Sequence, residues 1–271
     1  MTAAERYDAL CGRLAELDSV LVAYSGGVDS TLLAFAAHAV LGDRALAVLA
    51  TSDTYPVCEL DAARNTAQEL RLNLVEVETN ELADPRFSSN PPDRCYYCKQ
   101  ELFGMLRAVA DSRGLTHVAD GSNADDVSDH RPGRRAAAEY GVISPLQEAG
   151  MTKVDIREVS RALDLPTWDK PSMACLASRF PYGSLIDEGS LRRVADAEDA
   201  LRSLGLRQFR VRSHGDVARL EVESPEMDAA WARRYQISSA LRQAGFAYVT
   251  QDLEGYRTGS LNETLGERET S

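Results

Sequence analysis

A glycine-rich loop between an apolar strand and an apolar helix is the feature that most restricts how this chain can fold. Residues 20–24 (VLVAY) favour a buried strand, SGGVDS follows at residues 25–30, and an apolar helical pattern continues to Gly42. Consecutive glycines let the backbone turn sharply and direct its N–H groups inward, where a helix N-terminus adds positive potential. We therefore expect a phosphate site formed by Ser25, Gly26, Gly27, Val28, Asp29 and Ser30.

The loop itself contains no lysine of the Walker type, which argues against a loop that transfers a γ-phosphate. A purely structural interpretation is the alternative, in which the glycines form a turn and Asp29 or Ser30 caps the helix. The position of the loop between a strand and a helix favours phosphate binding.

Strand-like and helical patterns alternate through the first half of the chain. The expected strands are Val20–Tyr24, Ala45–Thr51, Leu74–Val77 and His117–Ala119. The expected helices between them are Thr31–Leu41, Glu59–Leu70 and Tyr96–Arg113. This alternation predicts an α/β fold: a doubly wound parallel sheet with helices on both faces and with ligands at the carboxyl ends of the strands.

A different pattern follows an irregular junction, residues 165–182, that contains three prolines. Before the junction, Thr152 and Asp155 form a loose capping pair for a helix that ends ahead of Pro166. After it we expect a helix over residues 188–204, strands over 208–212, 218–223 and 246–251, and one helix through Trp231 and Leu241. The sequence thus predicts a doubly wound α/β domain at residues 1–165 and a smaller C-terminal α+β domain at residues 166–271.

Composition narrows the class of protein. The 271 residues carry 30 Lys plus Arg against 42 Asp plus Glu, and a net charge of −12 argues against broad nucleic-acid binding. The longest nearly apolar run, residues 32–41, is too short to cross a bilayer, and the N-terminus is charged where a signal peptide would be apolar. We expect a cytoplasmic protein with no membrane partner.

Five cysteines in a reducing compartment favour metal or redox chemistry over disulfides. Cys95 and Cys98 have CxxC spacing at the start of a helix, where thiolate character is favoured, and Cys175 lies in KPSMACLASRFPYG. Structural zinc normally takes four ligands, and the chain has no second CxxC. Three cysteines suit an iron–sulfur cluster with one iron left open, whereas Cys11 and Cys58 are expected to be core or surface thiols.

The SGGVDS motif is similar to the signature of the PP-loop ATP pyrophosphatases, which split ATP between the α- and β-phosphates and transfer AMP to an acceptor oxygen. Further segments follow in order: DGSNADDVSDHRPGRRAAAE, SPLQEAGMTKVDIRE, LPTWDKPSMACLASRFPYG, FRVRSHGDVARLEVE and GFAYVTQDLEGYRTGS. Together, over nearly the whole chain, they resemble the LarE family of ATP-dependent sulfur transferases, which mature the nickel-pincer nucleotide cofactor of lactate racemase.

The resemblance implies an adenine nucleotide alpha hydrolase-like fold, with a PP-loop ATP pyrophosphatase domain at residues 1–165 and a C-terminal domain at residues 166–271 for substrate binding and oligomerisation. It also implies ATP and Mg²⁺, with Asp29 helping to hold the metal, and a homo-oligomer. It implies that a carboxylate of pyridinium-3,5-biscarboxylic acid mononucleotide is adenylated and then attacked by sulfur to give a thiocarboxylate. Some members sacrifice a cysteine, at the position of Ala174 here, and others hold a 4Fe-4S cluster on three cysteines. Cys95, Cys98 and Cys175 favour the cluster branch, with sulfur from Cys175 itself as the alternative.

Several charged residues gain roles from the same resemblance. Arg210 and Arg212 share one strand face and are expected to bind the substrate phosphate, with pairing to Glu221 and Glu223 as the alternative. Glu198 and Glu221 match positions that bind a divalent metal in the family, or they are solvated surface charges. Arg179 is expected at the AMP phosphate or beside the Cys175 thiol, with a salt bridge to Asp169 as the alternative.

A run of charges follows the strand expected at His117–Ala119. Its carboxylates stand where Mg²⁺ or another ligand would bind, although such runs are also common in solvated loops. The residues are Asp125, Asp126, Asp129, Arg131, Arg134 and Arg135.

Three other functions stay open at this point. A tRNA thiolase would use the same loop and a three-cysteine cluster, but the acidity of the chain weighs against it. An ammonia-using synthetase would not need the three cysteines. A non-catalytic nucleotide-binding module would use the CxxC for structural zinc.

Overall fold

A computed structural model of the chain describes residues 1–128, 132–171, 174–257 and 259–263. The chain divides into two compact units, residues 1–81 with 95–173 and residues 82–94 with 174–271. The expected boundary after residue 165 lies a few residues before the start of the second unit's main segment at residue 174. Residues 82–94, which we expected in the first domain, belong to the second unit.

The first unit is built on a four-stranded parallel sheet in the order β3-β2-β1-β4. Its strands are β1 Val20–Tyr24, β2 Ala45–Thr51, β3 Leu74–Glu78 and β4 His117–Ala119. In this register Val20 lies between Ala45 of β2 and His117 of β4, and Ala119 forms a further parallel bridge with Ile143. β1 and most of β2 are buried on both faces, which explains their continuous apolar sequences.

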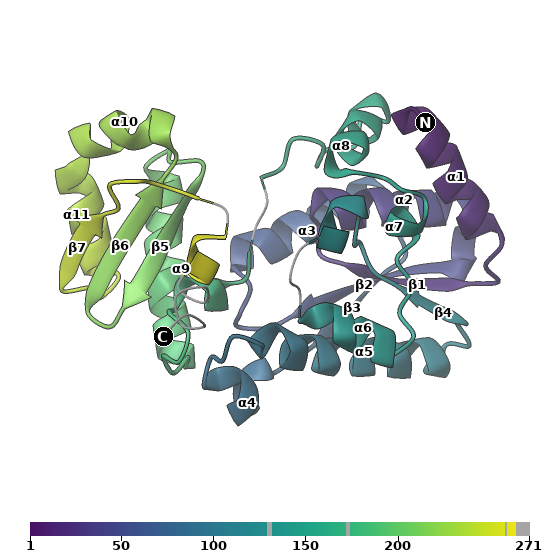
Figure 1. Cartoon of the computed structure of the whole chain (residues 1–271), viewed down its shortest axis with the longest axis horizontal. Helices are drawn as coiled ribbons and strands as arrows, with labels where there is room; N and C mark the ends of the chain where they lie inside the picture. The colour runs from purple at the N-terminus through teal and green to yellow at the C-terminus, as the bar shows by residue number, and fades with distance from the viewer. Residues whose placement is uncertain (129–131, 172–173, 258, 264–271) are drawn as a thin grey trace. The chain divides into compact units, whose positions relative to one another are not determined.

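Helices cover both faces of this sheet (Figure 1). They are α1 Ala3–Ala15, α2 Val28–Leu41, α3 Val57–Glu69, α5 Arg94–Ser112, α6 Gly133–Glu139, α7 Pro145–Glu148 and α8 Lys153–Ala162. One hydrophobic core packs α1, α2, α3, α7 and α8 against the β1 face that carries Val22 and Tyr24, and another packs α5 and α6 against the face that carries Leu21. The expected doubly wound α/β fold is therefore confirmed.

The second unit has a three-stranded sheet in the order β5-β6-β7. β5 Phe209–His214 runs antiparallel to β6 Val217–Val222, which runs parallel to β7 Tyr248–Gln251. Its helices are α4 Pro85–Ser88, α9 Glu188–Ser203, α10 Met227–Ala232 and α11 Arg234–Gln243. α9 packs against β5 and α11 and buries Val194 and Leu201.

The single helix expected through Trp231 and Leu241 is wrong, because α10 and α11 are separated at Arg233. The Arg233 backbone leaves the helical region, with φ −96° and ψ 10°. Its guanidinium donates to the carbonyl oxygen of Leu204 at 2.7 Å, which fixes the break against the end of α9.

Residues 82–94 join the second unit through backbone pairing. The Gly183 N–H donates to Asn90 O and the Ile186 N–H donates to Ser88 O, both at 2.8 Å. The Asn90 side-chain amide donates to Pro181 O at 2.7 Å.

No helix among the described residues is long and apolar enough to cross a membrane.

Candidate active site

The glycine-rich loop joins β1 to α2 and is held by its own two serines. The Ser25 N–H donates to Ser30 Oγ at 3.1 Å, the two hydroxyl oxygens are 3.1 Å apart, and the Ser30 hydroxyl donates to Gly27 O at 3.3 Å. Gly27 is the N-cap of α2 and provides no side-chain cap. Neither Asp29 nor Ser30 acts as the N-cap residue, so the first N–H groups of α2 are left for an external acceptor.

Two glycines allow other backbone segments to approach this loop. Gly26 has φ +68°, a left-handed conformation that is costly for residues with a side chain. Gly121, just beyond β4, backs onto the start of α2: a Cβ there would be 3.1 Å from Ser30 N. The carboxyl ends of β1 and β4 thus meet at the loop, as expected for a ligand site in a parallel sheet.

The Asp29 carboxylate lies in the first turn of α2 and has two partners from later segments. The Lys153 ammonium pairs with Asp29 Oδ2, and the Asn123 side-chain amide donates to Oδ1 at 3.4 Å. A partly exposed carboxylate beside a phosphate-binding loop is a suitable Mg²⁺ ligand by its chemistry. The sequence analysis predicted Asp29 at this site but missed both Asn123 and Lys153.

A second lysine reaches the loop from the segment beyond α8. The Lys170 ammonium donates to Gly26 O at 3.0 Å and pairs with Glu59 at 2.9 Å. Arg157 of α8 fixes this segment because it donates to Trp168 O at 2.8 Å and to Lys170 O at 2.7 Å. The two cations that contact the glycine-rich loop, Lys153 and Lys170, therefore come from other segments of the chain.

The carboxylates that follow β4 organise a loop next to the same site. Asp126 Oδ2 accepts from the Asn123 N–H at 3.0 Å, and Asp125 Oδ2 accepts from the Lys153 N–H at 2.8 Å. These contacts fix the two residues that hold Asp29.

The arginines of the charge run take surface positions where they are described. Arg135 is exposed, pairs with Glu139 at 3.6 Å and stacks on the ring of Tyr96. Arg134 is also exposed. Asp129 and Arg131 lie outside the described residues.

Cys95 and Cys98 lie one turn apart on α5, so that both thiols are on the same side of the helix. Cys95 is exposed, and the Cys98 thiol donates to Glu81 Oε1 at 3.6 Å. Glu81 is only 3% exposed, also accepts from the Thr79 hydroxyl, and has no described partner at Oε2.

Cys175 belongs to the second unit, where it precedes the 3-10 turn Leu176–Arg179. Neither unit by itself gathers three His, Cys, Asp or Glu side chains that could hold a metal ion, among the residues described. Whether Cys95, Cys98 and Cys175 act together stays a prediction. The remaining thiols lie elsewhere, Cys11 half-buried on α1 and Cys58 exposed on α3.

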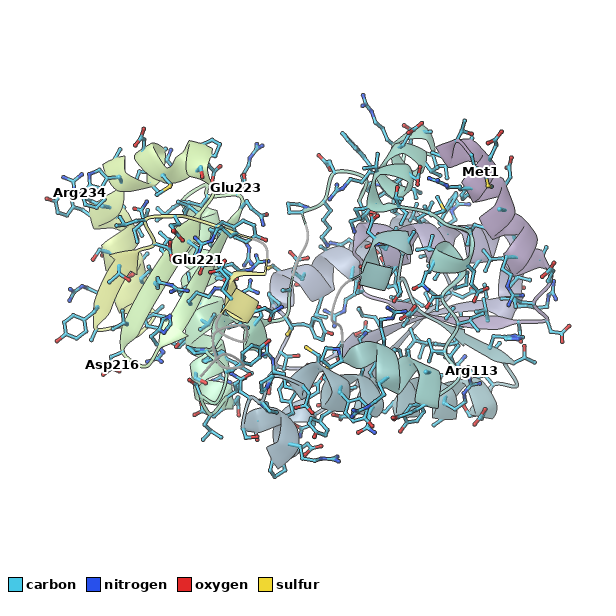
Figure 2. All side chains as sticks on the ribbon, viewed as in Figure 1. Met1, Arg113, Asp216, Glu221, Glu223 and Arg234 are labelled. Carbon is cyan, nitrogen blue, oxygen red and sulfur yellow. The ribbon has the colours of Figure 1, made fainter. Side chains whose placement is uncertain are left out.

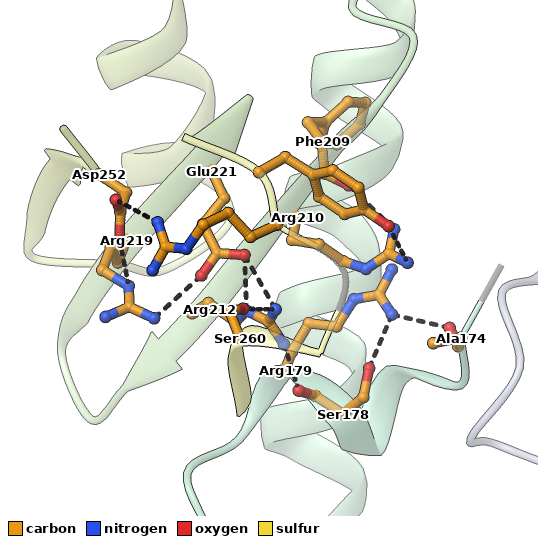
Figure 3. A network of polar contacts seen from close by, with 12 residues as sticks. Ala174, Ser178, Arg179, Phe209, Arg210, Arg212, Arg219, Glu221, Asp252 and Ser260 are labelled. Atoms are coloured by element: carbon orange, nitrogen blue, oxygen red, sulfur yellow. Dashed lines mark hydrogen bonds and ion pairs between the residues drawn. The ribbon is translucent and has the colours of Figure 1, made fainter. Parts of the chain in front are cut away.

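Buried arginines gather beside Glu221 in the second unit (Figure 3). Arg179 is fully buried and makes a bidentate pair with Glu198, both bonds at 2.8 Å. It also donates to Ala174 O at 2.7 Å and to Cys175 O at 3.2 Å. The alternative of a salt bridge between Arg179 and Asp169 is wrong, because Glu198 is the partner.

The neighbouring strands contribute a second ion pair to this cluster. Arg212 Nε donates to Glu221 at 3.0 Å, and the same guanidinium donates to Ser178 O at 2.6 Å and to the Ser260 hydroxyl at 2.9 Å. Glu198 and Glu221 are each 1% exposed, which rules out their interpretation as solvated surface charges. Glu221 lies within β6, whereas Glu223 is exposed beyond its end (Figure 2).

Arg210 lies directly opposite Glu221 in the sheet register. Its guanidinium donates to Phe209 O at 3.2 Å and to the Tyr256 hydroxyl at 3.3 Å. Burial, together with the positive charge of Arg179, lowers the pKa of Arg210 to about 10.

The chain is similar to known proteins over nearly its full length. No protein-family model matches the chain. An uncharacterized protein of Synechocystis sp. is 46% identical over 253 residues, 92% of this chain and 94% of that protein. The pyridinium-3,5-bisthiocarboxylic acid mononucleotide synthase of Lactiplantibacillus plantarum is 38% identical over 265 residues, 97% of this chain and 96% of that protein.

A more distant group of relatives matches only part of the chain. One subunit of the glutamine-hydrolyzing GMP synthase of Methanocella arvoryzae is 26% identical over 156 residues, which are 54% of this chain and 50% of that protein. The synthase of Lactiplantibacillus plantarum, by contrast, is similar over nearly the full length.

Proposed function

The chain belongs to the LarE family, and on that premise we propose that it is an ATP-dependent sulfur transferase that makes a mononucleotide thiocarboxylate. Its substrate is pyridinium-3,5-biscarboxylic acid mononucleotide, and its product is the precursor of a nickel-pincer cofactor. The single observation that carries this proposal is the near-full-length similarity to the bisthiocarboxylic acid mononucleotide synthase. A relative named for a small-molecule product does not favour a tRNA thiolase or a zinc-binding module.

Adenylation takes place at the loop between β1 and α2. The N–H groups at the start of α2 and the hydroxyls of Ser25 and Ser30 bind the phosphates that leave as pyrophosphate. Asp29 holds Mg²⁺, which offsets phosphate charge when it is bound. The substrate carboxylate becomes an acyl-adenylate, a far better electrophile than a carboxylate anion.

The substrate's phosphate is bound by the second unit. Arg210 is the first candidate because burial, and after it the positive charge of Arg179, lower its pKa, and a bound anion would stabilise the charged guanidinium. Arg212 is the second, although Glu221 and Ser260 already occupy part of its guanidinium. Arg179, expected at the AMP phosphate, instead has Glu198 and backbone carbonyls as its partners and serves to hold the segment that carries Cys175.

Sulfur delivery is assigned to the cysteines. Cys95 and Cys98, one helical turn apart, fit two ligands of a 4Fe-4S cluster, and Cys175 is the third. When bound, such a cluster supplies an open iron that carries sulfide as the nucleophile. Sacrifice of Cys175 is the competing route.

A divalent metal at Glu198 and Glu221 does not fit this structure. Both oxygens of Glu198 accept from Arg179, and the Val211 N–H donates to Oε1 at 3.1 Å. Both oxygens of Glu221 accept from arginines as well. No step is assigned to a metal there, and the homo-oligomeric state implied by the family stays a proposal.

The test is anaerobic incubation of the reconstituted protein with ATP, Mg²⁺, sulfide and the biscarboxylic acid mononucleotide, followed by mass spectrometry. We expect AMP, pyrophosphate and a product in which sulfur replaces a carboxylate oxygen. Asp29→Asn is expected to lower all three products together. ATP consumption without any thiocarboxylate would contradict the assigned substrate.

A further inference from the structure

Lysine is rare in this chain and is concentrated at the phosphate loop. Of its 30 cationic residues only three are lysines, Lys99, Lys153 and Lys170, and the rest are arginines. Two of the three contact the loop: Lys153 pairs with Asp29, and Lys170 donates to Gly26 O. Two of the three lysines in this arginine-rich chain therefore lie where ATP is expected to bind.

The side-chain cations of lysine and arginine differ in size and in the geometry of their hydrogen-bond donors. An ammonium is a compact point charge with three donors, whereas a guanidinium is a broad planar fork. Beside a tight loop, only the smaller group can follow a phosphate oxygen as bonds to phosphorus form and break.

The two lysines at the loop are held differently. The Lys170 ammonium is bound to both the Gly26 carbonyl and the Glu59 carboxylate, and its side chain is 19% exposed. Lys153 is the first residue of α8, where its N–H donates to Asp125 and the capping box of Thr152 and Asp155 fixes the helix start. Its side chain is 33% exposed beside the Asp29 carboxylate, which leaves the ammonium accessible to a ligand at the loop.

We propose that Lys153 is a catalytic residue of adenylation and supplies the cation that the loop itself lacks; this inference rests on the proposed function. In the step, a substrate carboxylate oxygen forms a bond to the α-phosphorus, and the bond from that phosphorus to the bridging oxygen breaks. Pyrophosphate leaves with the electron pair. Lys153 stays protonated and donates to the oxygens on which negative charge develops.

Lysine-directed acylation tests the contact without measuring turnover. The wild-type protein is treated with an acylating ester, with and without Mg²⁺ and α,β-methylene-ATP, and the three lysines are quantified by peptide mass spectrometry. We expect labelling of Lys153 to fall about tenfold with nucleotide. Lys99, whose ammonium packs on the Phe103 ring at 5.1 Å, is the internal reference and should not change. Unchanged Lys153 labelling under saturating nucleotide overturns the proposal.

Substitutions separate catalysis from binding. Lys153→Arg and Lys153→Gln should each lower the turnover number for pyrophosphate release by about 100-fold and change the nucleotide dissociation constant less than threefold. Lys99→Arg is the matched control and should behave as wild type, and thermal melting confirms that each variant is folded. Turnover by Lys153→Arg equal to wild type overturns the proposal.

The outcomes also distinguish this proposal from the proposed function. If nucleotide protects Lys153 but the wild type forms no thiocarboxylate, the contact with ATP stands and the assigned reaction fails. If the wild type forms thiocarboxylate and Lys153→Gln does so equally fast, the reaction stands and the role of Lys153 fails.

Discussion

Gly26 lies so close to Ala63 that a Cβ at position 26 would be 2.5 Å from the Cβ of Ala63. α3 cannot withdraw easily, because the Tyr24 hydroxyl donates to Ala63 O at 3.0 Å. α3 thus packs directly against the glycine-rich loop, and only glycine at position 26 fits this close contact.

Gly26→Ala should therefore unfold more easily and bind ATP poorly. The positive φ and the forced contact together should lower the free energy of unfolding by about 2–4 kcal/mol. Gly114→Ala is the control, because Gly114 also has a positive φ, +67°, but no atom near its added Cβ. It should lose only about 1 kcal/mol in urea titrations and retain ATP binding. Equal losses in the two variants would show that the contact with Ala63 is unimportant.

Asp155 ties α8 to α1 and should make stability depend on pH in the acid range. Burial raises the pKa of Asp155, but hydrogen bonds from Thr152 and Arg6 outweigh it, so the net shift is below the ordinary value of 3.8. Such a carboxylate stabilises the fold above its unfolded pKa, and this contribution is lost as pH falls through the lower folded pKa.

Asp155→Ala should accordingly lower the free energy of unfolding at pH 7 by about 1–2 kcal/mol. The difference from wild type should shrink as pH falls below the ordinary carboxyl pKa, measured by chemical denaturation across a pH series. Glu5→Ala is the matched control, since Glu5 holds the same place in the exposed capping box of α1 and should cost less. A loss for Asp155→Ala that is independent of pH would rule out the carboxylate as its cause.

The fold was predictable where one physical rule dominated. The strands Val20–Tyr24, Ala45–Thr51 and His117–Ala119 have the predicted bounds. The first two are the central strands of the parallel sheet, which are largely buried on both faces and therefore read as apolar runs. Residues 82–94 carry no such signal. Their place in the second unit depends on Asn90 meeting Pro181, a contact between distant segments that no local pattern reveals.

Arg210 should be needed for substrate binding but not for stability. Since burial and neighbouring cations already lower its pKa to about 10, replacing it removes repulsion as well as contacts. Arg210→Met should keep its free energy of unfolding within about 1 kcal/mol of wild type. It should bind the mononucleotide about 10- to 100-fold more weakly by calorimetry, the loss expected for charged hydrogen bonds to phosphate. Wild-type affinity in this variant would remove Arg210 from the phosphate site.

Iron and sulfide should bind under anaerobic reconstitution and depend on three particular thiols. Cys95→Ala, Cys98→Ala and Cys175→Ala should each lose the cluster, whereas Cys58→Ala, an exposed thiol on α3, should keep it. Iron and sulfide assays with visible absorption measure this. Unchanged iron in all three variants would favour sacrifice of Cys175, which mass spectrometry would detect as loss of H₂S after one turnover.

The candidate site was inferred from motifs rather than from charge. Ser25 to Ser30 and the CxxC stand out in the sequence because of their spacing, and their roles stay predictions. Sequence could not show that Glu198 is buried, because one glutamate in a helix looks like any other. Lys153 was also missed, yet a signal was present: the chain has only three lysines, and two of them contact the loop.

The ion pair of Arg179 and Glu198 should be worth far more to this fold than a surface pair, since neither partner can reach water if the other is removed. Glu198→Gln should lower the free energy of unfolding by about 3–5 kcal/mol, because it leaves the fully buried Arg179 charge uncompensated. Glu188→Gln, which breaks an exposed pair with Arg192, should cost less than about 1 kcal/mol.

The double variant Arg179→Met with Glu198→Met separates stability from function. Replacing both charges with apolar groups should recover most of the lost stability. Activity should not recover, because Arg179 also donates to Ala174 O and Cys175 O and so holds the sulfur-bearing segment in place. Urea unfolding and thiocarboxylate formation, measured on the same preparations, separate the effect on stability from the effect on activity. Full activity in the double variant would mean that the arginine serves the fold alone, whereas a stable but inactive protein would show that it positions Cys175.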